Sequence, residues 1–125
     1  MEIIAREKAI VRLANKASTD LSGKEGFIAE YDSGLKTSGG TNAFGVITEG
    51  GATESDVAIL GTVDAVLRGK AAGTIAVGNK LKVDSNGKLA AYTTGAGTEI
   101  GVALEAAAAD ELFAFAPMAP VVHAS

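Results

Sequence analysis

The segment KLKVDSNGKLAAY, residues 80–92, has the pattern of a β-hairpin. Polar and apolar side chains alternate along residues 80–83, as they do in a strand with one buried face. Residues 84–87 form the turn, and their Asn-Gly pair tolerates the positive φ angles that tight hairpin turns require. Residues 88–92 supply the return strand. This part of the chain is therefore predicted to be antiparallel β structure.

Similar short apolar segments, separated by glycine-containing turns, occupy most of the chain from residue 26 onwards. The predicted strands are residues 26–31, 44–48, 57–60, 63–68, 80–83, 88–92, 100–104 and 112–115. About eight short strands at this spacing are typical of a β-sandwich or β-barrel. The alanine-rich residues 105–111 are predicted to be a turn or a single helical turn, because the segment between two strands is short. The sequence thus predicts an all-β fold.

Two halves of this region resemble each other. Each half has a segment of the form G-x-[IL]-A-x-Y, then a segment of the form G-V-x-x-E, then a short apolar strand. The aligned pairs are residues 26–31 with 87–92, 44–49 with 100–105, and 57–59 with 113–115. The last two pairs share one offset. The repeat predicts a small, pseudo-symmetric antiparallel β-barrel built from two related halves.

The two ends of the chain are predicted to differ from this body, which covers residues 26–117. The apolar residues within residues 2–14 fit neither the helical nor the strand period. We therefore expect residues 1–25 to form an extended N-terminal arm that becomes ordered only against a partner. Residues 118–125 form a C-terminal tail. The single histidine, His123, lies in this tail and is expected at the surface.

The composition of the 125 residues excludes most kinds of active site. Since there is no Cys, the chain has no disulfides, thiolate metal ligands or cysteine nucleophiles. One His cannot form a histidine metal cluster within one chain. The glycine-rich segments 73–80 and 95–101 lack the residues that phosphate-binding and dinucleotide-binding motifs require. We therefore predict no catalytic residues, no metal, no cofactor and no enzyme activity.

The formal net charge is −4, with a slightly basic segment at residues 1–24 and an acidic remainder. An acidic body argues against nucleic-acid binding. The first residues carry charges where a signal peptide needs apolar side chains. The apolar run at residues 112–125 is interrupted by Pro117 and Pro120 and is too short to span a bilayer. We expect neither nucleic acid nor membrane as a partner, and a chain that stays soluble in a cytoplasm.

Three motifs carry a resemblance to a known family. They are AFGVITEGG at residues 43–51, VGNKLKVDSNGKL at residues 77–89 and EIGVALEAA at residues 99–107. In their order and spacing, over roughly residues 26–117, they resemble the head decoration proteins of tailed bacteriophages, also called capsid cement proteins.

This resemblance implies a compact β-barrel or β-tulip fold and a structural role without catalytic residues or cofactor. It also implies a virion protein, made in the host cytoplasm, that sits on the outer capsid surface and clamps neighbouring major capsid subunits. Members of the family usually form homotrimers. The expected partners are therefore the major capsid protein and further copies of this chain, and no small-molecule substrate is expected.

The arm is the part of the chain that we expect to contact the capsid. Its apolar side chains would pack on the capsid or add a strand, and its basic side chains would pair with acidic capsid groups. The residues expected to bind are Ile3, Ile4, Arg6, Lys8, Ile10, Val11, Arg12, Leu13 and Lys16. The alternative is a stand-alone β-barrel module that binds a small ligand or carbohydrate, although 4 Phe and 2 Tyr, mostly at core-like positions, leave few aromatic rings for a sugar.

Overall fold

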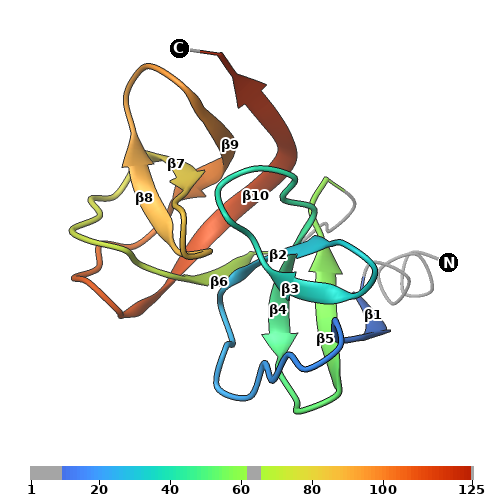
Figure 1. The fold of residues 1–125 in the computed structure, drawn as a ribbon. Coiled ribbons are helices and arrows are strands. Elements are labelled where there is room, and N and C mark those ends of the chain that lie inside the picture. Colours follow the sequence, from blue (N-terminus) through green and yellow to red (C-terminus); the bar gives the residue numbers. More distant parts are fainter. Residues whose placement is uncertain (1–9, 62–65, 125) are drawn as a thin grey trace, which may run out of the picture.

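The computed structural model describes residues 10–61 and 66–124, which form ten strands in two five-stranded sheets (Figure 1). The first sheet contains β1 (Ile10–Ala14), β2 (Ile28–Tyr31), β3 (Leu35–Thr37), β4 (Gly45–Glu49) and β5 (Glu54–Ile59). The second contains β6 (Leu67–Lys70), β7 (Lys80–Val83), β8 (Leu89–Tyr92), β9 (Gly97–Ala103) and β10 (Leu112–His123). All pairings within the two sheets are antiparallel. The all-β prediction is confirmed.

Neither sheet closes into a barrel among the described residues. The strand order is β1-β5-β4-β2-β3 in the first sheet and β6-β10-β9-β7-β8 in the second. In the described part of the chain, the two terminal strands of each sheet are linked only by an isolated parallel bridge next to β1 and next to β6. Where one small barrel or β-tulip was predicted, the described residues form two five-stranded sheets, because turn signals do not determine the pairing of distant strands. No helix in residues 10–61 or 66–124 has the length and apolar character needed to cross a bilayer.

The two sheets share one topology. Strands β1 to β5 correspond in sequence order to strands β6 to β10, and with this correspondence the strand order of the first sheet becomes the strand order of the second sheet. The pairing registers agree as well, because Gly45 of β4 pairs with Ala29 of β2, and Gly101 of β9 pairs with Leu81 of β7. In both halves a glycine of one strand thus lies opposite a fully buried side chain of its neighbour.

This shared topology confirms one part of the predicted repeat and corrects another. Strands β4 and β9 are equivalent, in agreement with the predicted alignment, and β5 is equivalent to β10. The predicted alignment of β5 with β10 is displaced by two residues, because the registers match Val57 with Phe115 and not with Phe113. Residues 26–31 correspond to β7, however, and not to residues 87–92 as predicted. The true equivalent of β8 is β3, a strand that the sequence did not predict. Leu35 of β3 and Leu89 of β8 also form matching isolated parallel bridges, to Asn15 and Ala71.

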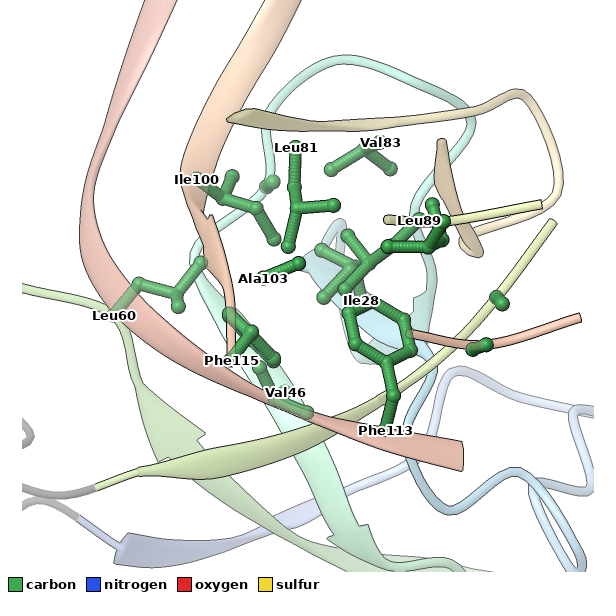
Figure 2. Close-up of a cluster of buried hydrophobic side chains, with 14 residues drawn as sticks. Ile28, Val46, Leu60, Leu81, Val83, Leu89, Ile100, Ala103, Phe113 and Phe115 are labelled. Carbon is green, nitrogen blue, oxygen red and sulfur yellow. The ribbon is translucent and has the colours of Figure 1, made fainter. Parts of the chain in front are cut away.

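A shared hydrophobic core joins the two halves (Figure 2). The first half contributes Ile28, Ala43, Val46 and Leu60. The second half contributes Ala71, Ile75, Leu81, Val83, Leu89, Ile100, Ala103, Ala107, Phe113 and Phe115. A smaller cluster lies within the first half and consists of Leu21, Phe27, Ala29, Leu35, Ile47 and Val57. Because protein interiors are close-packed, the shared core couples the halves into one unit.

Both ends of the described chain are more ordered than the sequence predicted. Residues 10–14, expected in a partner-dependent arm, form β1 and pair with β5 along its length. Residues 118–123, expected in a tail, continue β10 through an irregularity between Pro117 and Val121. Beyond Phe115, β10 pairs with β9 but no longer with β6. Proline has no backbone N–H group, and it is tolerated on the side of a strand where no neighbouring strand would accept a hydrogen bond.

Candidate interaction surfaces

The residues predicted to bind a capsid divide into two groups. Ile3, Ile4, Arg6 and Lys8 lie outside the described residues. Ile10, Val11, Arg12 and Leu13 lie on β1, and Lys16 follows two residues after that strand. The structure thus brings the described members of the set together along one edge of the first sheet, where β1 is the terminal strand.

Side chains of β1 alternate between two environments. Val11 and Leu13 are partly buried, and Leu13 packs against the smaller core cluster. Ile10 and Arg12 point to the other side, and Ile10 is 49% exposed. Of the apolar residues predicted to contact a partner, Ile10 is therefore available to do so, whereas Leu13 stabilises the fold.

Arg12 is already surrounded by carboxylates of its own chain. Its Nε lies 3.0 Å from Oδ1 of Asp56, the residue directly opposite on β5. Its guanidinium nitrogens also lie 3.8 Å from a carboxylate oxygen of Glu49 and 3.9 Å from one of Glu54. An acidic group of a partner would have to compete with these three carboxylates.

Lys16 is paired in the same way. Its Nζ lies 2.9 Å from Oδ2 of Asp32. The hydrogen bond from Lys16, with the attraction of its positive charge, holds the pKa of Asp32 below the usual range. The two described cations of the predicted binding set are therefore both engaged within the chain.

The outer edge of β1 offers unpaired backbone groups. The Asn15 amide donates to the carbonyl oxygen of Thr53 at 2.8 Å, beside β5. Backbone direction alternates along a strand, so the amides of Arg12 and Ala14 point away from β5. Among the described residues β1 itself pairs only with β5, but directly after it the Lys16 amide donates to the carbonyl oxygen of Leu35 on β3 at 2.8 Å. The outer edge is therefore open along residues 10–14 and closed by β3 beyond them. An extended segment of a partner could therefore add to this edge by main-chain hydrogen bonds.

A polar cavity of about 590 Å³ lies where the loop after β3 meets the turn between β7 and β8. Its walls include Phe27, Glu30, Lys24, Lys36 and Lys88. Only 7% of Phe27 is exposed, and Nζ of Lys24 lies 4.8 Å from the ring centroid. Glu30 accepts a bond from the Gly39 amide and pairs with Lys36. The ring is thus covered, and the cavity gives little support to the alternative of a carbohydrate site.

His123 is held in place at the end of β10. Its Nε2 lies 3.0 Å from Oε1 of Glu99 on β9, and its ring stacks on Tyr92 with centroids 4.9 Å apart. The expected surface histidine of a loose tail is therefore a half-buried strand residue. No hydroxyl group among the described residues is hydrogen-bonded to this pair. Within the same residues, no cluster of His, Asp and Glu could hold a metal ion.

The outer face of the second sheet was not singled out by the sequence. Arg68 of β6 and Lys80 and Lys82 of β7 form no ion pair with any described residue. Exposed Val102 of β9 lies directly opposite Lys80. The K-x-K spacing at residues 80–82 was the available signal, because it places two lysines on one face of a strand.

Comparison with known proteins identifies the family. A family model described as phage cement protein matches residues 4–117. No curated protein matches the chain. The crystal structure of the head fiber gp8.5 N base of bacteriophage phi29 has the same fold, with a TM-score of 0.58 and 18% sequence identity, covering 91% of this chain and 99% of that chain. Since the family model spans most of its length, this chain belongs to the phage cement protein family.

Proposed function

We propose that this chain, a structural protein of the phage cement family and not an enzyme, binds the outer surface of the assembled head and clamps neighbouring major capsid subunits. The observation that carries the proposal is the core shared by the two halves. A clamp needs contact surfaces held at a fixed distance on one body. Because Ile28 and Val46 of the first half pack with Phe113 and Phe115 of the second, contacts made by either half are transmitted to the other.

The first contact surface is the edge formed by β1 together with the residues before it. Arg12 and Lys16 already have carboxylate partners, so the binding energy comes chiefly from the outward amides of β1 and from exposed Ile10. A capsid strand would add beside β1 and continue the first sheet. Ile3, Ile4, Arg6 and Lys8, which lie outside the described residues, would extend the same contact along the capsid.

The protein acts as a homotrimer. The sequence is rich in alanine and glycine. Such small residues permit close approach of subunits but provide little apolar area each, and burial stabilises by about 25 cal/mol per Å². A single contact would therefore be weak. Three copies bound to one symmetric position on the head would gain avidity without any new contact.

Co-sedimentation with expanded, undecorated heads of the phage that encodes the chain tests this function. The protein should bind saturably, at a fixed ratio to capsid subunits. Removal of residues 2–9, which leaves β1 and its pairing with β5 in place, should weaken binding strongly. Ala14→Pro, which removes an amide that points away from β5, should also weaken it, because proline is tolerated at a strand edge but cannot donate.

Tyr31→Ala is the matched control. Tyr31 lies at the end of β2, is 56% exposed and does not belong to the proposed contact along β1, so its loss should leave binding unchanged. A protein that remains folded but fails to bind such heads at any concentration, or that binds a soluble sugar or other small molecule saturably instead, would contradict the proposed function.

A further inference from the structure

The outer face of the second sheet has an equivalent in the first sheet that is buried. In the first sheet Ile28, Val46 and Ala58 lie side by side across β2, β4 and β5. The same register places Lys80, Val102 and Ala116 side by side across β7, β9 and β10. Ile28, Val46 and Ala58 are at most 1% exposed, and the first two belong to the shared core. Val102, by contrast, is 36% exposed.

We call the exposed counterpart the open face. It is formed by Arg68, Lys80, Lys82, Val102, Ala114 and Ala116. Cross-strand partners project to the same side of a sheet, as do residues two apart on one strand. The pairs Arg68 with Ala114 and Lys80 with Val102 therefore lie on one surface. Of its residues, Arg68, Lys80 and Val102 are exposed, and Lys82, Ala114 and Ala116 are partly buried.

One cation on the open face lacks the partner that its equivalent has. Arg68 on β6 is the equivalent of Arg12 on β1. Arg12 lies opposite Asp56 on β5, Arg68 lies opposite Ala114 on β10, and Asp56 and Ala114 hold equivalent positions in their strands. Asp56 binds Arg12 at 3.0 Å. The second half thus keeps the arginine and replaces its carboxylate by a methyl group.

The open face combines this unpaired arginine with a shallow apolar centre. Lys80 and Lys82 add two further cations without a carboxylate partner among the described residues. Val102, Ala114 and Ala116 between them carry no side-chain donor or acceptor. Glu99 of β9 lies directly opposite Lys82, but its carboxylate is already bonded to His123. An apolar surface beside cations that have no carboxylate partner of their own is the pattern of a protein interface whose partner carries the opposite charge.

We propose that the open face docks on the capsid through a surface that presents carboxylates beside apolar side chains, with one carboxylate taking the place beside Arg68 that Asp56 takes beside Arg12. This inference rests on the proposed function and adds a second contact on the second half. A polyanion fits less well because the chain carries a net charge of −4. A second copy also fits less well, since the acidic group on its first sheet, formed by Glu49, Glu54 and Asp56, already surrounds Arg12.

The test measures binding of the full chain to undecorated heads over a range of salt concentrations. The double variant Arg68→Ala/Lys80→Ala should bind at least about tenfold more weakly at low salt, because truncation of paired interface charges is costly. Its affinity should also fall less steeply with added salt, because fewer ion pairs remain to be screened. Charge reversal by Arg68→Glu should weaken binding further. The matched control Lys24→Ala/Lys36→Ala also removes two positive charges, but from the cavity beside β3, and it should bind normally.

Each other result counts against the inference. If the double variant and the unaltered protein bind equally well, the open face does not dock on the capsid, while the proposed function remains intact. Failure of the unaltered protein to bind heads would overturn both. If the double variant instead loses self-association in sedimentation velocity runs without heads, the occupant is a second copy, and the assigned partner is wrong.

Discussion

The two halves of the molecule have the same topology but use equivalent surfaces differently. In the first half, Val46 is buried under the second half. In the second half, the equivalent Val102 faces outward beside lysine and arginine side chains that have no ion-pair partner in the part of the chain that the structure describes. The same difference separates Arg12, which has carboxylate neighbours, from Arg68, which has none among the described residues. One copy of the sheet thus buries this surface in the shared core, and the other leaves its charged residues exposed.

The largest expected effect comes from placing the same charge at the two equivalent valines. Val46→Asp should lower the free energy of unfolding by about 4 kcal/mol or more, because an unpaired charge would be buried between the halves. Val102→Asp should cost about 1 kcal/mol or less, since the residue is exposed and only strand propensity is lost. Urea unfolding measures both, and equal losses would show that the two faces are not buried differently.

The equivalent glycines should behave alike, in contrast to the valines. A Cβ at Gly45 would press against Val57 and the backbone of Ala58, and one at Gly101 would press against the backbone of Ala116. Gly45→Ala and Gly101→Ala should therefore each cost about 1–3 kcal/mol through overpacking. Thermal or urea unfolding tests this. A loss at one position only would contradict the equivalence of the β4 and β9 registers.

A smaller difference is expected between the two arginines. Arg12→Ala should reduce stability by about 0.5 kcal/mol, because exposed ion pairs contribute little. Arg68→Ala should leave stability unchanged within error, because no carboxylate among the described residues binds it. If Arg68→Ala proved the more destabilising variant, Arg68 would have a structural partner and the open face would lose its free cation.

The smallest effects concern two exposed carboxylates, one in each half. Hydrogen bonds from Lys16 and Lys88, with the attraction of their charges, lower the pKa of Asp32 and Asp110 below the ordinary 3.8. A lowered folded-state pKa contributes stability above about pH 3.8, and this is lost as the pH falls through the lowered value. Lys16→Gln should raise the pKa of Asp32 alone in a carbon-detected NMR titration. A matching rise at Asp110 would show unexpected coupling between the halves.

Sequence patterns predicted those elements whose partners lie nearby in the chain. The hairpin at residues 80–92 was predicted almost residue for residue, because its strands pair across a short turn that contains Asn-Gly. Strand β1 was missed because its partner β5 lies 44 residues away, from Arg12 to Asp56. Polar and apolar side chains alternate only weakly along residues 10–14, so this segment forms a strand only because it pairs with the distant β5.

The candidate surfaces were predictable to a similar, limited extent. The basic and apolar character of residues 10–16 was visible in the sequence, but their internal ion pairs depend on residues of β5 and of the turn after β2. Arg68 gave no signal at all. Its importance follows from the absence of a carboxylate at Ala114, a residue that only the strand register brings opposite to it.

A cryo-electron microscopy map of decorated heads tests the central claim most directly. The account predicts one rigid two-half body on the outer surface, with the edge of β1 against one capsid subunit and the open face, at Arg68 and Val102, against the carboxylates of a neighbouring subunit. A body that contacts a single subunit, or that leaves the open face in solvent while the head is fully decorated, would contradict it.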